Sequence, residues 1–180
     1  LTPQQAEQLA ARGALQLDSH QAAGDPLQLI ANGAYQLGEA LRAARRLSDK
    51  GQSWQLIYLQ EPGRFRAPRD HWEAACCATT EEREQLFPGG ARRVVLTHMR
   101  PEVLRGHLAG AFGNPAQTSV LGYLNRGGTL NEAGMLFANR CTWAHALVAA
   151  ARLCQRDPLD WLSADELASA EGRGDPGLLR

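Results

Sequence analysis

Three short apolar runs, separated by a helical pattern and turns, constrain the fold more than any other feature. They are residues 27–31, 54–59 and 93–97, with the compositions and lengths of buried strands. Between the first two, apolar residues recur at helical spacing (Leu37, Leu41, Ala44 and Leu47), and Lys50-Gly51 is a typical helix end. Because a strand, a helix and a strand joined by short turns form a βαβ unit, these segments predict a parallel sheet with a right-handed crossover.

Two further runs complete a predicted five-stranded sheet. Residues 14–17 alternate in the manner of an edge strand, and residues 119–123 form the last apolar run. Helices are expected at 81–87, from Pro101, and at 142–155. We therefore predict a three-layer α/β/α fold with a mostly parallel five-stranded sheet and one antiparallel edge strand.

The expected organisation is one domain with a short segment on each side. Residues 1–13 are interpreted as a helical lead-in, 14–155 as the α/β domain and 156–180 as a C-terminal tail. The tail carries a helix-capping pattern at Ser163–Glu166 before it becomes rich in glycine. The chain begins with Leu instead of Met, which is typical of a piece cut from a longer protein.

Composition excludes several classes of function. The formal net charge of the 180 residues is zero, so no basic stripe for nucleic acid is expected. No apolar run approaches the roughly 18 residues of a membrane span, and no signal peptide is visible, so we expect a cytoplasmic protein without a membrane partner. The four cysteines lack zinc-ligand spacing and are expected to be reduced, buried thiols.

Two glycine-containing turns are candidate ligand sites. Asn32-Gly33 lies between a strand and a helix, but the dinucleotide fingerprint is absent, so a tight turn is favoured over phosphate binding. The loop Asn125-Arg126-Gly127-Gly128 follows the last strand, at the edge where open α/β sheets bind ligands. Arg126 there could pair with a carboxylate or a phosphate, or equally with a neighbouring domain.

Two of the five histidines are candidates for chemistry. His98 follows a strand and His145 lies on the last long helix. Either could act as a general acid or base if another domain supplied the remaining groups, and either could instead be a packed structural residue. Because the histidines, serines and cysteines form no hydrolase or metal pattern, the chain shows no self-contained active site.

Several local motifs follow one another as in a known superfamily. Residues 27–33, the following helix with Glu39-Ala40 and 43–47, and the strand 54–59 are similar to the opening of the C-terminal domain of transketolase-like enzymes. Residues 86–98 resemble the matching stretch of phosphoketolases, as do Gly122, Tyr123, Gly127, Met135, Asn139 and His145 at ungapped spacing. The homodimeric pyruvate dehydrogenase decarboxylating subunit is similar over the same region.

The resemblance covers residues 14–155 and leaves the subfamily open. Residues 59–66 depart from transketolase, and the segment after Gln155 departs from phosphoketolase. The substrate implied is therefore a keto-sugar phosphate or a 2-oxo acid, without a choice between them.

The resemblance also implies what this chain lacks. In these enzymes thiamine diphosphate and Mg²⁺ bind between a diphosphate-binding and a pyrimidine-binding domain, both of which precede the C-terminal domain. The Gly-Asp-Gly metal–diphosphate motif does not occur here, so we expect no catalytic, cofactor-binding or metal-binding residue in this chain.

The expected partners are the preceding pyrimidine-binding domain and a second subunit of a homodimer. The candidate interface or substrate-entrance residues are Arg126, Gly127, Gly128, His98 and His145.

Two other classes of function remain open. The chain could be a stand-alone binding or regulatory module that keeps the fold, or a small α/β enzyme with its site around Gly127-Gly128. The coding region upstream of Leu1 distinguishes these two classes from a transketolase-like C-terminal domain. Only the C-terminal domain is expected to follow a long reading frame with a diphosphate-binding motif.

Overall fold

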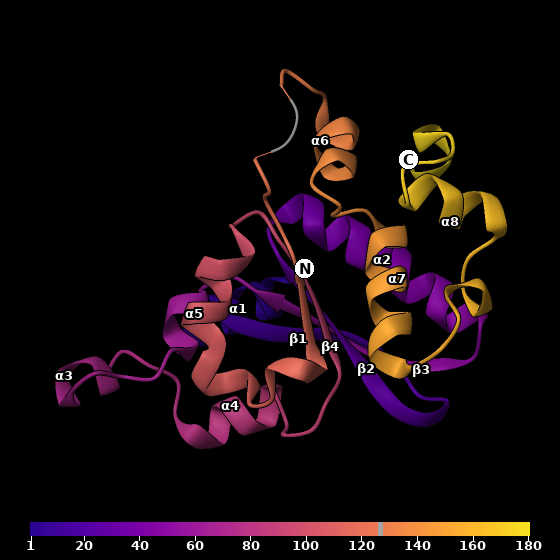
Figure 1. Ribbon diagram of the computed structural model, residues 1–180. Helices are drawn as coiled ribbons and strands as arrows, with labels where there is room; N and C mark the ends of the chain where they lie inside the picture. The colour runs from indigo at the N-terminus through magenta and orange to yellow at the C-terminus, as the bar shows by residue number, and fades with distance from the viewer. Residues whose placement is uncertain (126–127) are drawn as a thin grey trace.

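The computed structural model describes residues 1–125 and 128–180, and its centre is a five-stranded sheet (Figure 1). The strands are β1 (Ala14–His20), β2 (Ala23–Asn32), β3 (Gln52–Leu59), β4 (Arg93–Thr97) and β5 (Thr118–Leu121). Their order across the sheet is β1-β3-β2-β4-β5. All neighbours are parallel except β1, which pairs antiparallel with β3 at one edge. The predicted sheet, including its antiparallel edge strand, is confirmed.

Helices cover both faces of the sheet, which gives the three layers. The longer helices are α2 (Ala34–Asp49), α5 (Pro101–Phe112) and α7 (Trp143–Cys154). Helices α2 and α7 lie together on one face, and α5 lies on the other (Figure 1). The shorter helices are α1 (Pro3–Arg12), α3 (His71–Ala74), α4 (Thr80–Leu86), α6 (Glu132–Ala138) and α8 (Ala164–Ala170). Single 3₁₀ turns are η1 (Pro62–Phe65), η2 (Pro115–Gln117), η3 (Pro158–Asp160) and η4 (Pro176–Leu179).

The path from β1 to β2 passes around the amino end of β3. Only two residues join these strands, yet β3 lies between them in the sheet. The Ala22 amide donates to the Ser53 hydroxyl over 2.9 Å, and Ser53 is buried. Because this bond satisfies a backbone donor at the crossing, the antiparallel edge strand is tied to the parallel part of the sheet.

Helices α2 and α7 pack closely because the side chains between them are small. Ala40, Ala43 and Ala44 of α2 are buried in the same cluster as Ala144, Ala146 and Ala150 of α7. The Glu39 carboxylate of α2 accepts the Trp143 amide at 2.7 Å and so caps the first turn of α7. Burial raises the pKa of Glu39, and this hydrogen bond opposes the rise.

Residues 156–180, expected as a tail, pack onto this layer. Trp161, Leu162, Ala170 and Leu179 belong to the buried cluster that contains α2 and α7. The Trp143 indole donates to the Leu179 carbonyl over 3.2 Å. The glycine-rich composition concealed this packing, because only a few widely spaced apolar residues carry it.

The segment between β3 and β4 contains α4, the helix expected at 81–87, and it corrects one expectation. Cys77 is buried, but Cys76 is exposed. Cys76 follows α3, a single helical turn that projects from the body of the domain (Figure 1). Because that turn contributes no buried residue, Cys76 lacks the buried surroundings expected for all four thiols.

Candidate functional site

The carboxyl ends of the parallel strands are held together by one buried asparagine, Asn32. Its side-chain amide donates to the Leu59 carbonyl of β3 over 2.8 Å, and its Oδ1 accepts the Thr97 hydroxyl of β4 at 2.7 Å. The Thr97 hydroxyl in turn accepts the Met99 amide at 3.0 Å. Asn32 is therefore used in joining three strand ends, which agrees with a structural turn at Asn32-Gly33.

His98 lies on this edge, where sequence analysis expected a candidate residue. Its Nδ1 is 3.0 Å from the Asn32 carbonyl oxygen, and its amide donates to the same oxygen over 3.1 Å. A carbonyl only accepts, so Nδ1 carries a proton, and the neutral form of the ring keeps its lone pair on Nε2. The exposed ring can therefore accept a hydrogen bond from a ligand or a neighbouring surface.

A pocket of about 350 Å³ opens beside His98. It is lined by Tyr35, Gln36, Thr97, His98, Tyr123, Glu132, Met135, Leu136, Asn139 and Cys141. Two aromatic residues of its lining stay uncovered: Tyr35 is 60% exposed and Tyr123 37%. This edge therefore combines a binding hollow with a largely apolar rim, which is typical of a surface that meets another one.

Gly122 brings the chain after β5 against the end of β4. A Cβ at this position would lie 2.4 Å from the Met99 carbonyl oxygen and 2.7 Å from Thr97 Cγ2. The next amide, of Tyr123, donates to that same Met99 oxygen over 2.9 Å. Only glycine permits this approach, and the approach positions Tyr123 beside His98.

The glycine loop after β5 is only partly described. Arg126 and Gly127 lie outside the described residues, so their expected role stays a prediction. Gly128 is exposed, and its carbonyl accepts the Leu130 amide at 3.0 Å.

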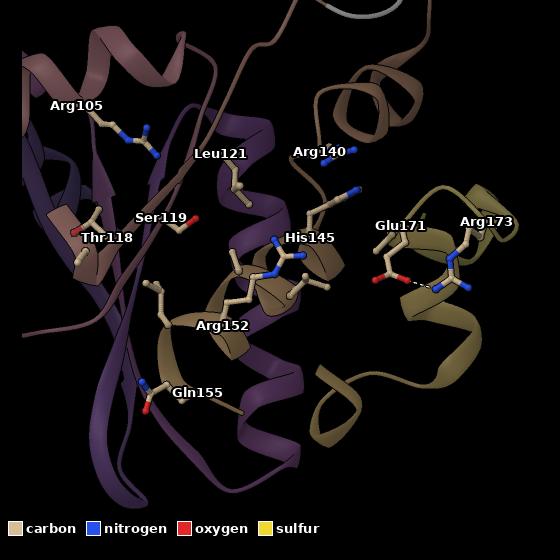
Figure 2. Close-up of a pocket in the computed structure, with 15 residues that line it drawn as sticks. Arg105, Thr118, Ser119, Leu121, Arg140, His145, Arg152, Gln155, Glu171 and Arg173 are labelled. Atoms are coloured by element: carbon tan, nitrogen blue, oxygen red, sulfur yellow. Dashed lines mark hydrogen bonds and ion pairs between the residues drawn. The ribbon is translucent and has the colours of Figure 1, made fainter. Parts of the chain in front are cut away.

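A second, larger cavity of about 740 Å³ lies beside the edge strand β5 (Figure 2). It is bounded by β5, α7 and the end of α8, with Arg105 contributed by α5. Four arginines and one glutamate line it: Arg105, Arg140, Arg152, Arg173 and Glu171. Sequence reasoning missed this cluster because the four arginines come from separate segments without a shared motif.

His145 lines this second cavity, whereas His98 lines the first. The His145 ring is buried, with Nδ1 2.7 Å from the Thr142 hydroxyl and an edge contact to Phe137. Burial, helped by the positive charge of Arg140, lowers the pKa of His145 to about 4, against a hydrogen bond to the Ala170 carbonyl. At neutral pH this histidine is uncharged and acts as a wall of the cavity.

The described residues provide no metal centre. No group of three or more His, Cys, Asp or Glu side chains among them is arranged to hold a metal ion. We therefore assign no residue of this chain to Mg²⁺ or to the diphosphate of thiamine diphosphate, and derive no chemical step through them.

The chain matches no protein-family model and no curated protein. Among the described helices, none has the length and apolar character needed to cross a membrane.

Proposed function

We propose that this chain is the C-terminal domain of a cytoplasmic, homodimeric, thiamine-diphosphate-dependent enzyme of the transketolase-like superfamily. It contributes to subunit assembly and borders the substrate entrance, and it is not catalytic alone. The parent enzyme acts on keto-sugar phosphates or 2-oxo acids. The proposal rests on the resemblance of residues 14–155, and the apolar rim at the carboxyl edge is the structural observation that supports it most.

The carboxyl edge is suited to contact with another protein surface. Tyr35 and Tyr123 present aromatic rings there, and such rings carry much of the binding energy in protein interfaces. His98 adds an exposed acceptor to the same pocket, and no nucleophile paired with a base lines this pocket among the described residues. An edge of this kind favours binding over independent catalysis.

The reading frame upstream of Leu1 tests the proposal first. We expect an uninterrupted frame that encodes a Gly-Asp-Gly diphosphate-binding motif and a second preceding domain. A stop codon followed by a start codon directly before Leu1 would contradict it.

Subunit association in the parent enzyme tests the assigned edge. Tyr35→Ser combined with Tyr123→Ser should weaken association by at least about tenfold, because each substitution removes an aromatic contact. Sedimentation over a range of concentrations measures it. Trp72→Ser is the matched control, since Trp72 is 75% exposed but lies on α3, away from the edge.

One observation favours a second function, a stand-alone binding or regulatory module. The arginine-lined cavity has the dimensions of a ligand pocket, and its lining residues all come from this chain. A start codon directly before Leu1, together with ligand binding at this cavity, would support the second function over the first.

A further inference from the structure

The cavity beside β5 has an excess of positive charge that the described residues do not neutralise. Of its four arginines, Arg173 is paired with Glu171, the one carboxylate in the lining. Within the described part of the chain, the guanidinium groups of Arg105, Arg140 and Arg152 form neither a hydrogen bond nor an ion pair. Unpaired guanidinium groups around one hollow attract anions, and their planar forks bind phosphate and carboxylate oxygens in pairs.

The arginines approach the cavity from different elements. Figure 2 shows Arg105 on the β5 side and the Glu171–Arg173 pair on the α8 side, with Arg140 and Arg152 between them. Elements far apart in sequence therefore place like charges around one space. Because like charges repel, this arrangement costs folding free energy that a bound anion would recover.

Two lining residues, Arg140 and Gln155, also hold a strained backbone. Three non-glycine residues of the described chain have left-handed φ, and two of them line this cavity: Arg140 at 56° and Gln155 at 54°. Glycine adopts this conformation at lower cost than other residues. Each position instead carries a long side chain with hydrogen-bond donors at the cavity, and strain of this kind collects at binding sites.

Hydroxyl groups of β5 add neutral donors to the wall. Thr118 and Ser119 line the cavity, and the Thr118 hydroxyl is buried without a hydrogen-bond partner among the described residues. A buried hydroxyl without a partner is costly, and an anion oxygen can accept from it. His145 offers no further donor, because its ring is already bonded to Thr142 and Ala170.

We propose that this cavity binds a small polyanion, an organic molecule with at least two phosphate or carboxylate groups. Arg140 and Arg152 hold one anionic group and Arg105 a second, with the β5 hydroxyls as neutral donors. The volume of about 740 Å³ lies in the usual range for such ligands. The site is independent of the proposed function, because it needs neither the carboxyl edge nor thiamine diphosphate.

Calorimetric titration of the 180-residue chain with inorganic pyrophosphate tests the site. At about 50 mM salt, where screening is weak, we expect one saturable site with a Kd below about 1 mM, weakening as salt increases. Arg152→Gln should weaken binding at least about tenfold, because it removes a charge-assisted donor. Arg45→Gln, an exposed arginine on α2 that does not line this cavity, should leave the affinity unchanged.

Arg140→Gly separates binding from folding. Glycine relieves the left-handed backbone, so the thermal midpoint should stay equal to or rise above that of the parent chain, while pyrophosphate binding weakens at least about tenfold. A variant that binds poorly because it is misfolded would show a lowered midpoint instead.

The proposal is overturned if pyrophosphate shows no saturable binding up to about 10 mM. It is also overturned if Arg152→Gln and Arg140→Gly bind like Arg45→Gln. Binding of a poly-glutamate peptide without binding of pyrophosphate would overturn the small-molecule assignment and identify the cavity as a site for an acidic protein segment.

Discussion

Arg46 of α2 and Glu166 of α8 form a two-pronged ion pair across 120 residues of sequence, with N–O distances of 2.9 and 2.8 Å. The Arg46 guanidinium also donates to the Trp161 carbonyl over 3.1 Å and lies 4.9 Å from the centre of the Trp143 ring. One arginine therefore connects α2, α7, η3 and α8, which is how residues 156–180 become part of the folded domain.

Removing that pair should loosen the C-terminal segment. Arg46→Met is expected to lower the free energy of unfolding by about 1–2 kcal/mol, the range for a two-pronged, partly exposed pair. Hydrogen exchange should increase in α8 more than in β2 or β3, which checks that the effect is local. Arg42→Met is the control, because among the described residues the Arg42 guanidinium forms one ion pair, with Glu39 at 3.3 Å. Equal losses in the two variants would contradict the role given to Arg46.

His145 should make the fold sensitive to acid. Its pKa is about 4 in the folded chain and about 6.5 when exposed. Below pH 6.5 the unfolded chain therefore binds a proton that the folded chain does not, and the free energy of unfolding falls until about pH 4. The loss is about 2–3 kcal/mol over this interval.

His145→Gln isolates that contribution, because glutamine does not titrate. Urea unfolding of both chains at several pH values should show the variant gaining stability relative to the parent between pH 6.5 and 4. Stability curves that run parallel over this pH range would contradict the claim that His145 is buried and uncharged in the folded chain.

Gly122→Ala should destabilise the carboxyl edge by about 1–3 kcal/mol, because the added methyl group meets a backbone oxygen that cannot move freely. Thermal or urea unfolding measures the effect. Gly106→Ala on α5 is the matched control, since a Cβ there meets nothing within 4 Å and alanine favours a helix. If both substitutions change the free energy of unfolding equally, the close backbone approach at Gly122 does not require glycine.

The cysteines should differ in reactivity. Cys76 is exposed, whereas Cys77 and Cys141 are buried, and burial raises the pKa of Cys141 to about 12. A thiol reagent at neutral pH should therefore modify Cys76 first in the native chain and all four cysteines only after unfolding. Cys76→Ser should remove the fast phase. A disulfide or one bound zinc per chain would contradict four free thiols.

The isolated chain should show no Mg²⁺-dependent binding of thiamine diphosphate, because the described residues contain no ligand set for the metal. The titration is best made with the Arg152→Gln variant, in which anion binding at the separate arginine-lined cavity is weakened. Micromolar binding that requires Mg²⁺ would contradict the assignment of the cofactor site to other domains.

The candidate residues differ in whether the neighbouring sequence alone could predict their positions. His98 could be placed at the carboxyl edge from sequence, because it directly follows an apolar strand of the predicted parallel sheet, and the carboxyl ends of parallel strands meet at one edge. Its neighbours Tyr35 and Tyr123 could not be selected, because their exposure depends on which elements cover the edge. His145 was placed on its helix, but its bonds to Thr142 and Ala170 arise from packing.

The amino-acid sequence by itself determined the five strands, the longer helices and the parallel sheet, because these follow from local periodicity and short connections. Only the tertiary structure decided that residues 156–180 join the core and that Arg105, Arg140 and Arg152 surround one cavity. Such contacts join segments as far as 120 residues apart, as in the Arg46–Glu166 pair, and no local pattern encodes them. Burial and the proximity of charges depend on how whole layers pack.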